Sequence, residues 1–272
     1  MTRSPLYLAT AIEGALAAGR THRRYFRQQI RVDKKGPIDL VTAADLEAEA
    51  GFRALIASRF PDHVVLGEEA GAGTVAEGRP APCRWIIDPV DGTTNFVHGL
   101  ALFCVSVALE IDGRVDVAAV YEPIGDELFT AERGQGARLN GRPLRVSQCG
   151  DLIDALLCTG FPYSIRDERR AQVDVFAAFL ERARGVRRLG SAALDLCYLA
   201  AGRFDGFWEE KLHPWDMAAG VLVIEEAGGV VTSYGGASFD LFGARIVASN
   251  GRIHDAMLEA LDAARAPDGG HQ

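Results

Sequence analysis

The chain has 272 residues and a formal net charge of −8, and 48% of its residues are hydrophobic while 24% are charged. These proportions are typical of globular proteins and exclude a disordered chain or a fibrous repeat. The acidic balance argues against nonspecific nucleic-acid binding but does not exclude an anionic substrate, because bound cations can reverse the local field. The length fits a single domain over 1–272, made of two closely packed lobes near 1–145 and 146–265, with a frayed tail at 266–272.

The cysteine pattern and the N-terminus bear on the cellular compartment. The five cysteines are odd in number and form no CxxC pair, so we expect free thiols in a reducing cytoplasm. Cys104 and Cys197 lie in apolar runs and are expected to be buried, whereas Cys83 could be partly exposed. Glu13 interrupts the N-terminal apolar stretch, which favours an amphipathic helix over an export signal. The uncharged run Gly99–Leu109 is far shorter than the ~20 residues that span a bilayer, so we expect no membrane association.

The first half of the chain alternates between helical and strand patterns. An amphipathic helix is expected near the N-terminus, and Thr42 is a candidate cap for a second helix over 43–59. Apolar runs separated by proline and glycine then indicate consecutive strands of one sheet. We expect Pro89 to end the second strand and the segment 133–141 to be rich in turns. The predicted strands are Val64–Leu66, Trp85–Asp88, Phe103–Glu110, Val115–Val120 and Glu127–Ala131.

The second half is predicted to be more helical. The segment Pro214–Ala227 opens with a proline at the first helical position and is apolar on all sides, so we expect a central buried helix there. Consecutive strands in the first half and interspersed helices favour a layered α+β fold. The other predicted helices are Val173–Arg184, Ala192–Ala201 and a C-terminal helix with Ile253, Met257 and Leu261 on one face.

One segment, residues 85–99, combines two carboxylates with small hydroxyl-bearing residues. Asp88 and Asp91 lie three residues apart on a chain that proline and glycine force to turn, so both can face one small volume. Carboxylate oxygens are the ligands that Mg²⁺ prefers. The Gly-Thr-Thr run at 92–94 could hold phosphate oxygens if it begins a helix. The alternative interpretation is an Asp-Gly hairpin turn between apolar runs.

Three further acidic groups have both a functional and an ordinary interpretation. Glu68 and Glu69 follow a predicted strand, where they are either metal ligands or a solvated pair. Asp216 lies in the first turn of the predicted buried helix and could simply complement the helix dipole. Asp39 and Asp45 flank the start of the second helix, and one of them could act only as a cap.

Together these segments resemble the inositol monophosphatase family of Mg²⁺-dependent, lithium-sensitive phosphatases. The similarity extends from about residue 7 to residue 262. The matching sequences are D-L-V-T-A-A-D at 39–45, G-E-E at 67–69, W-I-I-D-P-V-D-G-T-T-N-F at 85–96, F-T-A-E-R-G-Q-G-A at 129–137, L-N-G at 139–141, R-R-L-G-S-A-A-L-D at 187–195 and W-D-M-A-A-G at 215–220.

The resemblance implies an α-β-α-β-α sandwich, usually a homodimer, that holds two or three Mg²⁺ ions in each active site. Glu68, Asp88 and the backbone carbonyl of Val90 are implied to hold the first ion. Asp88, Asp91 and Asp216 are implied to hold the second, and Glu68 a weaker third through water. Thr93, backed by Asp45, is implied to orient the attacking water together with Glu68.

The resemblance also implies the substrate class. The T-T-N-F-V-H-G form of the motif resembles the inositol monophosphatase branch, so we expect a polyol monophosphate such as myo-inositol monophosphate. Histidinol phosphate and fructose 1,6-bisphosphate share the metal core and stay open, the latter because the run Arg182, Arg184, Arg187 and Arg188 could bind a second phosphate. The implied substrate-binding residues are Asp91, Gly92, Thr93, Thr94, Gly190, Ser191, Ala192, Glu209 and Asp216.

A binding role is the alternative to catalysis. Some bacterial relatives act as partners of transcription and RNA-processing machinery, which would make this chain a binding partner rather than an enzyme. Nothing in this acidic sequence favours a nucleic-acid or transcription-factor partner. A complete set of metal ligands favours catalysis, because a pure binding module could lose any of them.

Overall fold

The computed structural model describes residues 6–28, 32–34, 40–69, 82–162 and 165–265, and every structural statement here concerns those residues. None of its helices is both long and apolar enough to cross a membrane. The helices are α1 (Leu6–Tyr25), α2 (Ala43–Arg59), α3 (Thr93–Val97), α4 (Ile165–Arg182), α5 (Ala192–Ala200), α6 (Pro214–Glu226) and α7 (His254–Arg265).

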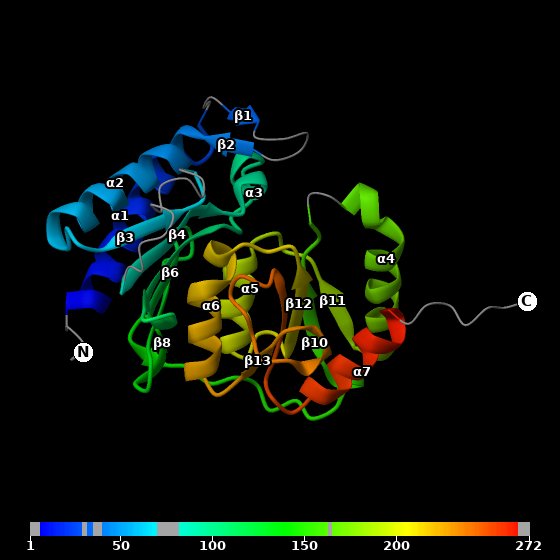
Figure 1. Cartoon of the computed structure of the whole chain (residues 1–272). Helices are drawn as coiled ribbons and strands as arrows, with labels where there is room; N and C mark the ends of the chain where they lie inside the picture. Colours follow the sequence, from blue (N-terminus) through cyan, green and yellow to red (C-terminus); the bar gives the residue numbers. More distant parts are fainter. Residues whose placement is uncertain (1–5, 29–31, 35–39, 70–81, 163–164, 266–272) are drawn as a thin grey trace, which may run out of the picture.

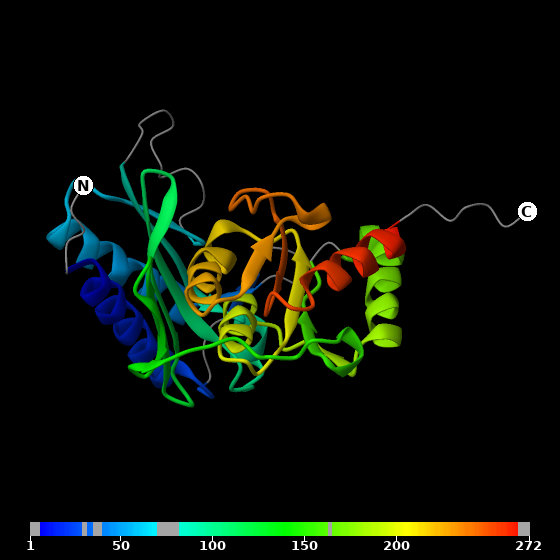
Figure 2. The ribbon, with the colours of Figure 1, turned by 90° about the horizontal axis from the view of Figure 1, so that it is seen from below.

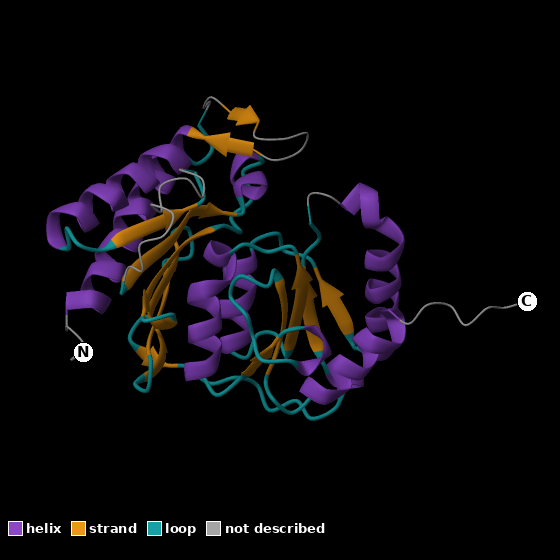
Figure 3. Ribbon diagram, in the orientation of Figure 1, coloured by secondary structure: helices purple, strands orange, loops and turns teal. Residues whose placement is uncertain are grey.

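Helices and sheets alternate in five layers (Figures 1 and 3). Helices α1 and α2 cover the outer face of a seven-stranded sheet, and α5 and α6 cover its inner face, as the view from below also shows (Figure 2). A five-stranded sheet follows, and α4 and α7 close the far side. The predicted α-β-α-β-α sandwich is therefore confirmed. The division into lobes near residue 145 stays a prediction.

The seven-stranded sheet has the order β3-β4-β5-β6-β7-β8-β9, with β3 parallel to β4 and all other pairs antiparallel. All five predicted segments form strands, and 136–139 also pairs within the segment that was expected to be rich in turns. A separate small ribbon pairs β1 (Val32–Lys34) with β2 (Leu40–Thr42). The strands of the large sheet are β3 (Val64–Gly67), β4 (Cys83–Asp91), β5 (Cys104–Ile111), β6 (Arg114–Glu122), β7 (Glu127–Glu132), β8 (Gly136–Leu139) and β9 (Arg142–Pro143).

Pro89 does not end β4, contrary to the prediction. Pairing with β5 continues to Asp91, and the register shifts between Asp88 and Asp91. Pro89 lies inside this irregularity, where no ladder hydrogen bond is needed from the N–H that proline lacks. The irregularity turns the strand locally and leaves both aspartates at its end.

The resemblance implied a second sheet, but the residue patterns predicted none of its strands. Its order is β11-β10-β12-β14-β13, with parallel and antiparallel pairs. Each strand has only three to five residues, and short buried strands carry no alternation that separates them from helical segments. Gly185, which directly follows the predicted helix Val173–Arg184, begins one of them. The strands are β10 (Leu156–Thr159), β11 (Gly185–Arg187), β12 (Gly206–Glu210), β13 (Val230–Thr232) and β14 (Arg245–Ser249).

The predicted helices form, with one large difference in bounds. Helix α4 begins at Ile165 rather than at Val173, because its first two turns are highly charged and carry no apolar stripe to signal a helix. Cys83, expected to be partly exposed, is only 4% exposed at the start of β4. All five cysteines are free.

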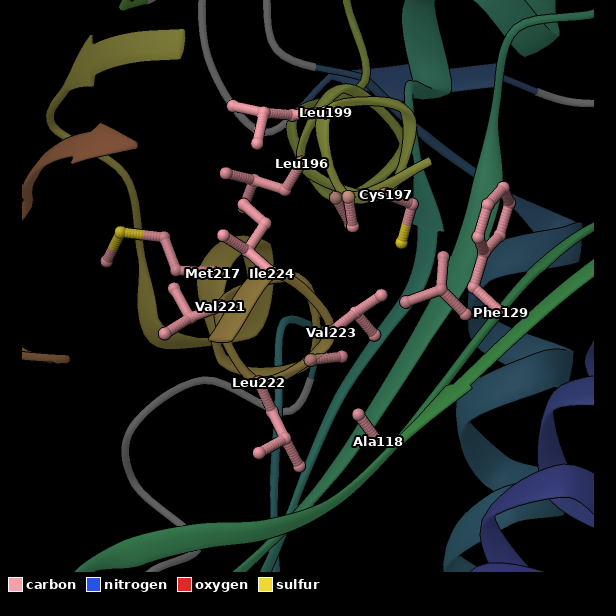
Figure 4. Packing of buried hydrophobic residues seen from close by; sticks show 14 of the residues in the cluster. Ala118, Phe129, Leu196, Cys197, Leu199, Met217, Val221, Leu222, Val223 and Ile224 are labelled. Carbon is pink, nitrogen blue, oxygen red and sulfur yellow. The ribbon is translucent and has the colours of Figure 1, made fainter. Parts of the chain in front are cut away.

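The middle helices form a core that both sheets share (Figure 4). Helix α6 is buried on nearly all sides from Met217 to Ile224, as predicted. Cys197 of α5 and Val223 of α6 point toward the strands that carry Phe129 and Ala118. Since this apolar cluster also contains residues of the five-stranded sheet, the two sheets are held through one helical layer.

His22 is a fully buried polar residue on α1. Its Nε2–H donates a hydrogen bond of 2.7 Å to the carbonyl of Pro89, and its ring contacts Phe96 and Phe103 edge-on. Burial lowers the pKa of His22 to about 4, with the hydrogen bond to Pro89 opposing that shift. The neutral imidazole is therefore the form that the fold stabilises.

We predict that His22 makes the protein less stable in acid. In the unfolded chain His22 takes up a proton near pH 6.5, whereas in the fold it does so near pH 4, so its contribution is complete above pH 6.5 and is lost as pH falls toward 4. The loss corresponds to about 3 kcal/mol. His22→Gln should flatten the dependence of the urea-unfolding free energy on pH across this window, whereas the exposed control His98→Gln should not. Equal slopes for His22→Gln and the wild type would contradict the assignment.

Candidate active site

A cleft of about 590 Å³ lies where the end of β4 meets β12 and the N-termini of α5 and α6. Nearly all the site residues expected from the sequence line it, and Asp45 contacts one of them from behind. The expected lining residues are Glu68, Asp88, Val90, Asp91, Gly92, Thr93, Thr94, Gly190, Ser191, Ala192, Glu209 and Asp216.

Three aspartates from two elements meet in this cleft. Asp88 and Asp91 come from the irregular end of β4 and Asp216 from the first turn of α6, and each offers a carboxylate oxygen within 4.8 Å of the other two. Burial and the neighbouring carboxylates raise the pKa of Asp88 and of Asp216 well above the ordinary value. Three carboxylates this close repel one another when ionised, so the cluster favours either protons or bound cations.

The donor set fits a hard divalent cation. Carboxylate oxygens and the nearby Val90 carbonyl are oxygen ligands of the kind that Mg²⁺ takes, and the three clustered residues include no sulfur or nitrogen ligand. Glu68 follows β3, which runs parallel to β4, and it is the charged neighbour that most raises the pKa of Asp88. The parallel pairing therefore places Glu68 beside the three aspartates.

Asp45 has the capping role and also contacts the cleft. Its Oδ2 accepts hydrogen bonds from the Thr42 N–H (2.8 Å) and the Thr42 hydroxyl (2.6 Å). Because Thr42 is the N-cap of α2, these bonds belong to the capping box at the start of that helix. Its Oδ1 lies 3.3 Å from the Thr93 hydroxyl, which also lies 2.9 Å from the Val90 carbonyl. The cap and the link to Thr93 are thus made by the two oxygens of one carboxylate. Asp39 lies outside the described residues.

The Asp-Gly pair does not form a hairpin. Gly92 has φ +96°, in the region that favours glycine, and α3 begins directly after it. A side chain at Gly92 would also lie 2.9 Å from the carbonyl oxygen of Leu102. The Gly-Thr-Thr run therefore turns from β4 into a short helix at the edge of the cleft.

The N-terminus of α5 holds Asp91. The carboxylate accepts hydrogen bonds from the Ser191 hydroxyl (2.7 Å) and from the backbone N–H groups of Ala192 (3.2 Å) and Ala193 (2.7 Å). Burial raises the pKa of Asp91 and these donors oppose the rise. Ser191 and Ala192, which were expected to contact the substrate, thus orient the carboxylate of Asp91. Ala193 was missed, although its place in the first turn of a predicted helix was a usable signal.

Glu209 forms the opposite wall of the cleft. It is buried at the end of β12, and burial, followed by the negative charge of Asp195, raises its pKa well above the ordinary value. Asp195 is 1% exposed, and its Oδ1 has no hydrogen-bond partner among the described residues. Of the four arginines in the run 182–188, all of which the structure describes, only Arg188 lines the cleft. Sequence reasoning missed Gly160, Phe161, Pro162, Asp195, Glu210, Lys211, Leu212, His213 and Trp215 as lining residues.

Comparisons with known proteins agree with this geometry. The chain is 45% identical to the Nus factor SuhB of Vibrio cholerae over 232 residues, which cover 85% of this chain and 86% of that protein. It is 44% identical to the inositol-1-monophosphatase of Mesorhizobium japonicum over 263 residues, 96% and 97% of the two chains. The solved structure of inositol monophosphatase from Anabaena (Nostoc) superposes with a TM-score of 0.85 at 42% identity and covers 95% of this chain and 96% of that one.

The model of one family matches almost the whole chain. It describes the inositol monophosphatase family and matches residues 6–266. The resemblance inferred from the sequence motifs is therefore confirmed, and this protein belongs to the inositol monophosphatase family.

Proposed function

We propose that this family member is a Mg²⁺-dependent phosphomonoesterase that acts on a small polyol phosphate, with myo-inositol monophosphate as the preferred substrate. The observation that carries the proposal is the convergence of Asp88, Asp91 and Asp216 within 4.8 Å beside the Gly-Thr-Thr turn. A relative of 44% identity is named inositol-1-monophosphatase, which supports the same substrate.

The metal-holding roles follow from the donor set. Glu68, Asp88 and the Val90 carbonyl would hold one Mg²⁺, Asp88, Asp91 and Asp216 a second, and Glu68 a weaker third through water. When bound, such cations neutralise the carboxylates, activate water and stabilise charge on the phosphoryl group. In the absence of cations, burial and the neighbouring carboxylates raise the pKa of Asp88, so a bound cation would stabilise its ionised form.

The chain's own groups would align the reactants. The Thr93 hydroxyl, held between Asp45 and the Val90 carbonyl, would orient the attacking water together with Glu68. Backbone N–H groups of the 92–94 turn would bind phosphoryl oxygens as negative charge develops. No side chain needs to form a covalent bond to phosphorus in this scheme.

The polyol would occupy the wall formed by Glu209. A buried carboxyl with a raised pKa can be held protonated, so Glu209 could both accept and donate hydrogen bonds to hydroxyl groups. Asp91, Asp216 and the segment 190–192 complete the proposed contacts. Histidinol phosphate and fructose 1,6-bisphosphate are the alternative substrates. A second phosphate could bind Arg188, which lines the cleft, whereas Arg184 forms an ion pair with Asp154.

We further propose, by family membership, a cytoplasmic homodimer that lithium inhibits. A second candidate role is partnership with a transcription complex, because several relatives at 42–45% identity bear the name Nus factor SuhB. The intact acidic cluster favours catalysis in either case, since a protein used only for binding has no need to gather three repelling carboxylates.

The proposed activity can be tested by phosphate release with Mg²⁺, with and without EDTA. The panel contains inositol 1-phosphate, fructose 1,6-bisphosphate, histidinol phosphate, 3′-phosphoadenosine 5′-phosphate and glycerol 2-phosphate. We expect the fastest EDTA-sensitive release from inositol 1-phosphate. A different preferred substrate would retain the metal chemistry and reject the polyol assignment, and no metal-dependent release from the panel would favour the binding role.

Asp91→Asn should lower kcat/KM for the preferred substrate by more than about 100-fold, because it removes a charged ligand that α5 holds in place. The variant keeps the size of the side chain, so circular dichroism should show an unchanged fold. Wild-type activity in this variant would contradict the metal assignment, whereas a protein-binding role would survive the substitution.

Stabilisation by Mg²⁺ should increase with pH. The folded pKa of Asp88 and of Asp216 is raised, so in metal-free protein their contribution favours folding at low pH and is lost as pH rises through the folded pKa. Mg²⁺ binds the ionised form and offsets that loss. We expect about 10 mM MgCl₂ to raise Tm more at pH 8 than at pH 5.5. A pH-independent increase would show that these carboxylates do not bind the ion.

A further inference from the structure

Glu49, one turn after Asp45 on α2, is a buried carboxylate that the proposed chemistry does not use. Its side chain is 4% exposed. One oxygen, Oε2, accepts a hydrogen bond of 2.8 Å from the N–H of Glu69, and the other, Oε1, accepts one of 2.8 Å from Nε of Arg53. A buried charge of this kind needs partners, and the carboxylate finds one of them on the strand-end turn that carries Glu68.

The approach of Glu49 to this turn depends on the absence of a side chain at Gly67. A Cβ at that position would lie 2.5 Å from the carboxyl carbon of Glu49 and 2.6 Å from each of its oxygens. The carboxylate therefore rests against the backbone directly before Glu68, while it binds the N–H directly after Glu68. Glu68 is held from both sides by one side chain of α2.

Arg53 extends the same contact by one more turn. Its guanidinium donates through Nη1 to the carbonyl of Val65 (3.1 Å) in β3, while Nε binds Glu49. Residues 45, 49 and 53 are spaced by four and share one face of the helix. That face contacts Thr93, the 67–69 turn and β3 in succession, so a single rigid helix sets the positions of Thr93 and Glu68 relative to each other.

We propose that Glu49 is a positioning residue that sets the affinity of the site for the divalent cation that Glu68 would hold. It does so by fixing the Glu68–Glu69 peptide against α2. The proposal rests on the role of Glu68 as a ligand in the proposed function. Groups that orient metal ligands without touching the metal commonly change metal affinity by 10- to 100-fold. Glu49 does so through the backbone rather than through the ligand side chain.

The test is a titration of Mn²⁺ into metal-free protein, followed by the electron paramagnetic resonance signal of the free ion. Mn²⁺ takes the same oxygen ligands as Mg²⁺. Glu49→Ala should raise the Mn²⁺ dissociation constant by roughly 10- to 100-fold. Gly67→Ala, which displaces the Glu49 carboxylate, should raise it similarly, and the double variant should bind no more weakly than either single variant because both changes break one contact.

Two substitutions serve as matched comparisons. Glu49→Gln keeps a carbonyl oxygen for the Glu69 N–H and should bind Mn²⁺ within about threefold of the wild type, as a conservative rescue. Glu47→Ala removes an exposed carboxylate from the same helix, where it pairs with Arg24, and should leave the dissociation constant unchanged.

Several outcomes would overturn the inference. A Glu49→Ala protein that is less stable in urea but binds Mn²⁺ normally would show that Glu49 serves only the fold. If that variant does not fold, Glu49→Asp decides, since the shorter side chain withdraws from the Glu69 N–H: normal binding rejects the role and weakened binding supports it. Asp88→Asn, titrated alongside, separates the two proposals, because Asp88 would be a ligand of both the first and the second ion. Normal Mn²⁺ binding by Asp88→Asn rejects the metal site itself. Weakened binding by Asp88→Asn together with normal binding by the Glu49 and Gly67 variants rejects only the role of Glu49.

Discussion

The central constraint on this molecule is that several carboxylates must be gathered in one small, poorly solvated volume. Asp88, Asp91 and Asp216 each bring a carboxylate oxygen within 4.8 Å of the other two, and burial together with repulsion from neighbouring carboxylates raises their pKa values. Such an arrangement cannot stabilise the fold by itself. The surrounding elements must therefore hold the groups in place, and the layered architecture supplies those elements.

Three helices contribute their N-termini to this task. Asp45 accepts a hydrogen bond from the Thr42 N–H at the start of α2, Asp91 accepts hydrogen bonds at the start of α5, and Asp216 accepts one from the His213 N–H at the start of α6. Unpaired N–H groups and the positive end of the dipole favour an anion at each of these positions. Carboxylates that repel one another are thus each held by backbone donors, and no lysine or arginine is needed among the three aspartates.

The sequence carried much of this arrangement, but unevenly. Thr42 and Asp45 mark the start of α2 correctly because capping is local, and Asp88 with Asp91 marks the site because both lie on one turn. Pro89 was misjudged since a bulge, which depends on the partner strand, can accommodate a proline inside a strand. The strands of the five-stranded sheet were not predicted from the residues, because short strands such as Leu156–Thr159 are defined by their neighbours rather than by their own pattern. The placement of Glu49 against Gly67 depends on a tertiary contact that no local spacing reports.

The shared helical layer also limits how the molecule can move. The apolar cluster that contains α5 and α6 extends without a break from Ile86 in one sheet to Phe207 in the other. Parting the two sheets would expose this cluster to water, and interiors packed in this way resist gradual deformation. We therefore expect the packed helical layer to fix the spacing between the carboxylates that β4 and α6 bring to the cleft.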